Sequence, residues 1–82
     1  MIKFKFDVAS ALKTAGMTAY KAQKSGIISQ DTWRKIKNND ANISMKSLNN
    51  ICMILNMQPE HLIYCERNDE KAKEEIEKFN NL

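Results

Sequence analysis

The chain has 82 residues, of which 43% are hydrophobic, and it contains two glycines and one proline. This length allows one domain around one core, and so few chain-breaking residues indicate helices joined by short turns. No apolar run approaches the roughly 20 residues of a membrane-spanning helix, and lysines interrupt the N-terminal stretch where a signal segment would lie. We therefore expect an all-α, cytoplasmic protein without membrane association.

The net charge of +3 is unevenly distributed. Residues 1–65 contain nine Lys or Arg against four Asp or Glu, a charge of +5, whereas residues 66–82 contain four against six, a charge of −2. A basic domain favours a polyanionic partner, although many basic proteins bind no nucleic acid. Charge alone is therefore weak support for a nucleic-acid partner.

Residues that commonly catalyse reactions or bind metals are few and scattered. Cys52, Cys65 and His61 include no Cys-x-x-Cys pair, whereas a structural zinc ion takes four ligands. No nucleophile has a histidine base at a characteristic spacing. We expect no enzyme activity, no cofactor, no metal and no small-molecule substrate, and we expect both thiols to be reduced.

The N-terminal residues predict a strand followed by a helix. Between Ile2 and Phe6, apolar residues alternate with lysine, so that Ile2, Phe4 and Phe6 share one side of a half-buried strand. Asp7 is expected to cap a first helix of about nine residues. Gly16 ends this helix.

Two short helices with a tight turn between them follow. Thr18 is a suitable N-cap for a helix through Lys24, which Gly26 closes in a left-handed conformation. Ser29 is expected to cap the next helix, from Gln30 to about Asn38. Its apolar residues, Trp33 and Ile36, point inward, and its polar face carries Gln30, Asp31, Arg34, Lys35 and Asn38.

A turn rich in Asn and Asp, residues 38–42, precedes the most regular helix of the chain. This helix starts at Ser44. Its apolar residues recur at helical intervals and predict the central core helix: Met45, Leu48, Ile51, Cys52 and Leu55. Pro59 begins a fifth, short helix, and residues 63–67 can extend and pair with the N-terminal strand.

An amphipathic helix is predicted from Asn68 onward. Ala72, Ile76 and Phe79 lie at helical spacing on an otherwise charged segment. Ile76 and Phe79 would be left in water unless something covered them, so they either fold back on their own domain or meet a second copy. The candidate surface for a second copy comprises Ile63, Tyr64, Ile76, Phe79 and Leu82.

Two short helices, the second with a polar outer face, form the geometry of a helix-turn-helix. The stretch MTAYKAQKSGIISQDTWRKIKNN (residues 17–39), followed by ISMKSLNNICMILNMQPEHLI (residues 43–63), resembles the Cro and phage-repressor (XRE-like) family of bacterial and phage regulators. The similarity covers roughly residues 3–66. It implies a compact five-helix domain like that of lambda repressor over residues 1–67, with the helix-turn-helix at about 18–38. Residues 68–82 would add an amphipathic helix that can serve in dimerisation.

The turn departs from the family pattern at one position. Members usually have a glycine where this chain has Ile27, and a larger apolar residue where it has Gly26. A β-branched residue is strained at positive φ. We therefore expect the turn to be shifted or lengthened by one residue.

The resemblance also implies a function: a transcriptional regulator, typically a repressor, that binds an operator in double-stranded DNA as a homodimer. In this family the helix after the turn enters the major groove, which assigns residues 30–38 to that role. Amide and guanidinium groups can pair with base edges, and the expected base contacts are Gln30, Asp31, Arg34 and Asn38. The expected contacts with the DNA backbone are Thr18, Ala19, Tyr20, Ser29, Thr32, Lys35 and Lys37.

Three of these assignments have alternatives. Asp31 would repel phosphate unless it accepts a hydrogen bond from cytosine, holds Arg34 in place, or acts only on the helix dipole. Trp33 is better explained as a core residue than as a stacking platform. The same fold could also be a protein-interaction module, such as an antitoxin or antirepressor. Steep salt dependence and preference for one DNA sequence would favour the regulator.

Overall fold

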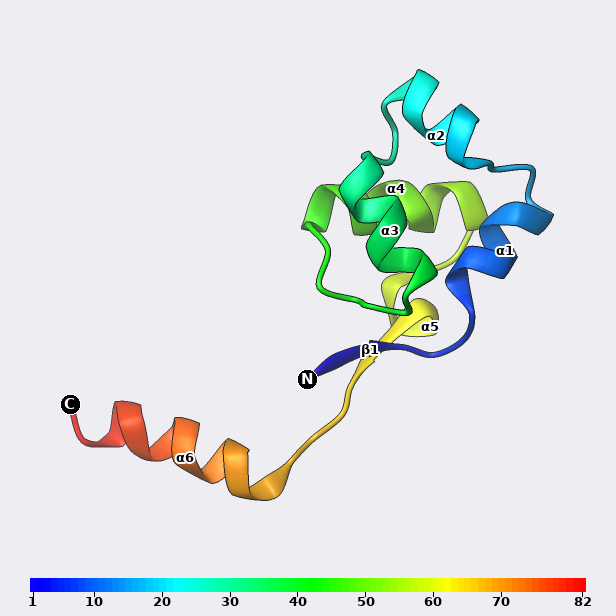
Figure 1. Cartoon of the computed structure of the whole chain (residues 1–82). Coiled ribbons are helices and arrows are strands. Elements are labelled where there is room, and N and C mark those ends of the chain that lie inside the picture. The colour runs from blue at the N-terminus through cyan, green and yellow to red at the C-terminus, as the bar shows by residue number, and fades with distance from the viewer.

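The structure, a computed structural model, describes residues 1–82 as six helices and a two-stranded sheet (Figure 1). The elements in chain order are β1 (Ile2–Phe4), α1 (Val8–Thr14), α2 (Ala19–Ser25), α3 (Gln30–Lys37), α4 (Met45–Leu55), α5 (Pro59–Leu62), β2 (Ile63–Cys65) and α6 (Asp69–Asn80). Helices α1 to α5 pack together, whereas α6 extends away from them. The fold is thus mostly helical, and the small sheet is its departure from the expected all-α class.

Short polar side chains define where most of the helices begin. Asp7, Thr18, Ser29, Ser44 and Asn68 each occupy an N-cap and accept a hydrogen bond of 3.1 Å from the backbone N–H three residues later. Each bond satisfies a donor that has no partner within its own helix. The predicted starts of α1 to α4 and α6 are therefore confirmed, although α1, with seven residues, is shorter than predicted.

The two strands pair antiparallel, with Phe4 opposite Ile63. This confirms the predicted pairing of two segments from opposite ends of the domain, over three residues in each strand. An ion pair of 2.5 Å between Lys3 and Glu66 lies beside the strands. The expected alternation holds only in part, because Phe4 is buried but Ile2 is exposed.

One hydrophobic core joins β1 and the five packed helices. The prediction that Trp33 and Ile36 point inward is confirmed, since both are buried. No residue of α6 is buried. The core consists of Phe4, Val8, Ala9, Leu12, Ala22, Ile28, Trp33, Ile36, Leu48, Ile51 and Leu62.

The predicted core face of α4 needs one correction. Leu48 and Ile51 are buried as expected, but Met45 is 79% exposed. Ser47 is buried instead. Its hydroxyl accepts a hydrogen bond of 3.0 Å from the Ser44 hydroxyl and lies 3.5 Å from the hydroxyl of Thr32. Successive side chains of an α-helix are rotated by about 100° around its axis. The buried face of α4 is formed by residues 47, 48 and 51, and Met45 lies more than a quarter turn away from the centre of that face.

Helix α6 gives the molecule an elongated outline. The principal extents are 48 × 20 × 20 Å, and in Figure 1 this helix, coloured orange to red, lies apart from the packed helices. None of the helices has the length and apolar character needed to cross a membrane.

We predict that Trp33→Ala destabilises the domain by about 3–5 kcal/mol, because it removes a large buried side chain from a small core. Unfolding in urea, followed by circular dichroism, measures this loss. Tyr20→Ala is the matched control: Tyr20 is exposed, and its loss should change stability by less than about 0.5 kcal/mol. A Trp33→Ala protein as stable as the control would show that the inward orientation of Trp33 is wrong.

Candidate nucleic-acid interface

The turn between α2 and α3 is set by one glycine and one buried isoleucine. Gly26 has φ +71°, and its N–H donates to the carbonyl of Ala22 at 3.0 Å. Ile27 avoids positive φ, and Ile28 is completely buried. The left-handed position thus falls on Gly26 rather than on Ile27, which agrees with the expected displacement of the turn.

A side chain from α4 holds this turn against the core. The amide Nδ2 of Asn50 donates to the carbonyl oxygen of Ile27 at 2.9 Å, across 23 positions of sequence. Sequence reasoning missed Asn50, because a helical asparagine next to Asn49 has no distinctive pattern. The only available signal was a polar residue beside Ile51, at the edge of the core-facing stripe of α4.

Polar side chains gather on the outer side of α3. Gln30, Arg34 and Asn38 are exposed and follow one another at intervals of four residues, which places them on one side of the helix. Lys37 is also exposed and forms no ion pair in the structure. Trp33 is buried beside Gln30 and Lys37, which lie three residues before and four residues after it, so the apolar and polar faces of α3 meet there.

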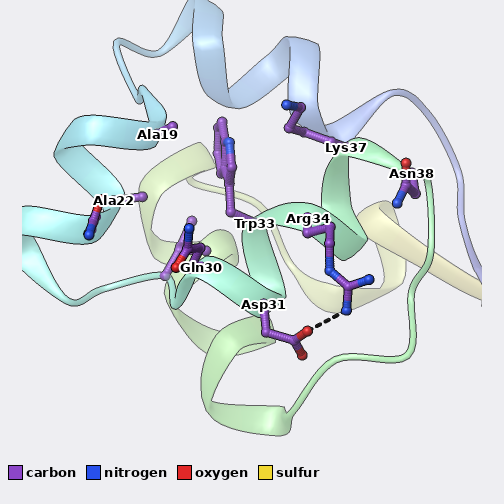
Figure 2. A pocket seen from close by; sticks show the side chains of 10 residues that line it. Ala19, Ala22, Gln30, Asp31, Trp33, Arg34, Lys37 and Asn38 are labelled. Atoms are coloured by element: carbon purple, nitrogen blue, oxygen red, sulfur yellow. Dashed lines mark hydrogen bonds and ion pairs between the residues drawn. The ribbon is translucent and has the colours of Figure 1, made fainter.

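Asp31 pairs with two cations of its own helix. One carboxylate oxygen lies 2.5 Å from Nη2 of Arg34 (Figure 2). The other lies 3.5 Å from Nζ of Lys35. The hydrogen bond from Arg34, followed by the charge of Lys35, holds the pKa of Asp31 below its ordinary value of 3.8. The same contact with Asp31 raises the pKa of Arg34. Of the alternatives for Asp31, the structure therefore supports the one in which it holds Arg34 in place.

A shallow groove of about 590 Å³ lies between α2 and α3. On the apolar side of this groove, the methyl groups of Ala19 and Ala22 lie beside the indole of Trp33 (Figure 2). Gln23 also lines the groove and was not among the predicted site residues. The signal for it was its spacing, because Ala19, Ala22 and Gln23 are three and four residues apart on one face of α2.

The residues expected to contact the DNA backbone fall into two groups. The first group is exposed. It comprises residues at the starts of α2 and α3 and one near the end of α3: Thr18, Ala19, Tyr20, Ser29 and Lys37. The other two, Thr32 and Lys35, are engaged within the protein.

Thr32 is 9% exposed, accepts a hydrogen bond of 2.9 Å from the Ser29 hydroxyl, and lies 3.5 Å from that of Ser47. This burial disagrees with the expected contact with the DNA backbone, because the Thr32 hydroxyl is engaged by Ser29 and lies next to that of Ser47. Lys35 is half-buried and donates to the carbonyl oxygen of Asn42 at 3.1 Å. Its ammonium group therefore supports the loop after α3.

No group of three or more His, Cys, Asp or Glu side chains comes together in a way that could hold a metal ion. Cys52 is half-buried in α4, whereas Cys65 is exposed at the end of β2, and neither forms a disulfide.

Two short helices joined by an anchored turn, the second with a polar outer face, define a helix-turn-helix. Comparison with known protein families matches residues 9–68 to the Cro/C1-type HTH DNA-binding domain. The matched region includes α2, the turn, α3 and α4, and the chain belongs to this family. Searches among curated proteins and among solved structures returned no match.

The pairing of Asp31 with Arg34 predicts how this carboxyl group titrates. Because its folded-state pKa is lowered, the ion pair is complete at neutral pH and is lost only as pH falls through that lowered value. Arg34→Gln should move the pKa back toward 3.8, as measured by NMR titration of the side-chain carboxyl carbon. Lys37→Gln, which removes a charge that does not contact Asp31, should leave the pKa nearly unchanged. Equal shifts in the two variants would show that no specific pair exists.

The bond from Asn50 to the turn predicts a loss of stability in Asn50→Ala of about 1 kcal/mol, the usual contribution of one hydrogen bond. Asn49→Ala removes the same side chain from the neighbouring exposed position and should cost less. Amide exchange at residues 26–29 should accelerate only in Asn50→Ala. Unchanged exchange there would mean that this bond does not hold the turn.

Proposed function

We propose that this protein is a sequence-specific regulator of transcription that binds double-stranded DNA with α3 in the major groove. The observation that carries the proposal is the outer face of α3, where Gln30, Arg34 and Asn38 are exposed. The turn before this helix is anchored in the core by Ile28. Membership in a family of DNA-binding domains supplies the context.

The side chains on this face have the chemistry of base readout. A guanidinium group can donate two hydrogen bonds to guanine, and the amides of Gln30 and Asn38 can each pair with adenine. Asp31 acts in base readout through Arg34, because it holds the guanidinium group before DNA arrives. A pre-positioned side chain loses less rotational freedom on binding, so this pair favours selectivity.

Contacts with phosphates would fix the orientation of the domain on the duplex. Thr18, Ala19, Tyr20 and Ser29 lie at the starts of α2 and α3, and Lys37 lies near the end of α3. Hydroxyl groups, backbone N–H groups and an unpaired ammonium group are the usual donors to phosphate. We leave Thr32 out of this set because it is buried.

The active form that we propose is a homodimer on an operator. A single recognition helix contacts too little DNA for tight specific binding, whereas a two-fold pair reads two half-sites separated by about 34 Å. A dimer bound at a promoter would block other proteins from the same DNA. Repression is therefore the expected outcome.

Selection of bound sites from random duplex DNA tests this function, followed by anisotropy measurements on the selected site. Arg34→Ala should weaken binding to that site about tenfold or more and relax selectivity at one base step. Lys37→Ala should weaken binding to selected and random DNA alike and reduce the salt slope by about one. Failure to enrich any sequence, with no salt-dependent binding, would reject the proposed function. Equal losses on both DNAs for Arg34→Ala would make Arg34 a phosphate contact instead.

A further inference from the structure

A second groove, lined by methionines, lies on α4 and on the residues that lead into α5. Its volume is about 480 Å³. Met45 and Met53 are 79% and 73% exposed on its rim, and Met57 is half-buried. Methionine side chains are flexible and polarizable, so they adapt to apolar partners. The residues around the groove are Met45, Leu48, Asn49, Cys52, Met53, Asn56, Met57, Gln58 and Pro59, none of them charged.

Helix α6 has an apolar face that its own domain leaves uncovered. Ala72, Ile76 and Phe79 follow one another at intervals of four and three residues and so form one stripe. Ile76 is 41% and Phe79 61% exposed, although both belong to a well-formed helix capped by Asn68. In the structure this helix does not fold back on its own domain.

We propose that α6 of one protomer lies in the methionine-lined groove of a second copy, and that the exchange is reciprocal. The inference rests on the homodimer of the proposed function and specifies how its two copies associate. Each protomer contributes one helical arm and one groove, so the two contacts are related by a two-fold axis and close on themselves. The mode of binding is an amphipathic helix in an apolar groove.

The two surfaces match in length, and the segments that carry them have opposite net charges. At 1.5 Å per residue, the stripe from Ala72 to Phe79 is about 10 Å long and the groove wall from Met45 to Met53 is about 12 Å long. Residues 1–65 carry a net charge of +5, and residues 66–82 carry −2. This difference favours the approach of an arm to a neighbouring domain.

The chain leaves the sheet in a direction that favours a second copy over the arm's own domain. Glu66 is held by the ion pair with Lys3, and its carbonyl oxygen accepts a hydrogen bond of 2.8 Å from the nitrogen of Met1. Only Arg67 and Asn68 remain before α6, and Arg67 is itself paired with Asp69 at 3.0 Å. Figure 1 shows α6 directed away from the packed helices as a result.

Such a dimer would leave the DNA-binding face free. The methionine-lined groove shares no lining residue with the groove between α2 and α3. Variants on one surface can therefore be tested without altering the other.

The first experiment measures self-association of the full chain by sedimentation equilibrium. In the double variant Met45→Gln and Met53→Gln, two exposed thioethers become amides of similar length, and the dimer dissociation constant should rise about tenfold or more. Lys46→Gln places the same amide at an exposed position outside the groove, and because it removes only one charge it should change the constant far less than the double variant does. A monomeric wild-type protein, or equal effects in the two variants, would overturn the proposal.

The second experiment identifies the two surfaces by mixing chains with single thiols. One chain carries Cys65→Ser and keeps Cys52 in the groove. The other carries Cys52→Ser, Cys65→Ser and Asn80→Cys, with its thiol beside the apolar stripe. A short bis-maleimide should join the two different chains. Dimers that cross-link only between two arm thiols would show that α6 pairs with α6, and would overturn the proposal.

A single chain carrying Cys65→Ser and Asn80→Cys, with Cys52 present, tests folding back. Cross-linking within one chain at high dilution, in place of cross-linking between chains, would also overturn the proposal. The two inferences can fail separately. Selective DNA binding without the cross-link between chains would leave the proposed function standing, whereas a cross-linked dimer that enriches no DNA sequence would leave only the present inference.

Discussion

The orientation of α3 depends on how the four residues before it are fixed. Ile28 is completely buried, and Asn50 binds the carbonyl oxygen of Ile27, so the turn is attached to the core at two points. Gly26 supplies the left-handed conformation directly before them, and nothing lies within 4 Å of the place where its Cβ would be. The requirement for glycine there is therefore conformational, and a β-branched residue would pay for positive φ with strain.

Once the turn is fixed, each position of α3 has a defined environment. Trp33 and Ile36 enter the core, and Thr32 follows them because Ser29 and Ser47 provide partners for its hydroxyl group. Arg34 remains outside, paired with Asp31. An exposed ion pair of this kind contributes little to stability. Its effect is on geometry, since it limits the directions in which the guanidinium group can point.

Local chemistry explains which features could be predicted from sequence. N-caps such as Thr18 and Ser29 act within three residues, so helix starts were predictable, as was the inward face of α3. Thr32 and Asn50 depend on partners 15 and 23 positions away, and no local pattern reports those contacts. Met45 fits the apolar periodicity of α4, but the buried face of that helix includes Ser47, whose hydroxyl lies 3.5 Å from that of Thr32, and leaves Met45 exposed. The roles proposed for Gln30, Arg34 and Asn38 follow from the exposed face and the family, and remain predictions.

The polar face of α3 and the apolar surfaces on α6 and α4 differ in how favourably they interact with water. The polar side chains on the outer face of α3 are well hydrated, so their exposure in the absence of DNA costs little free energy. The stripe on α6 and the rim formed by Met45 and Met53 instead expose apolar area to water, which is unfavourable. Covering that area favours association before DNA is present. If both proposals hold, operator binding and dimerisation are linked, because DNA with two half-sites stabilises the dimer by as much as dimerisation strengthens DNA binding. The short connection between Glu66 and α6 then matters for function, since it sets how the two copies of α3 are spaced along the duplex.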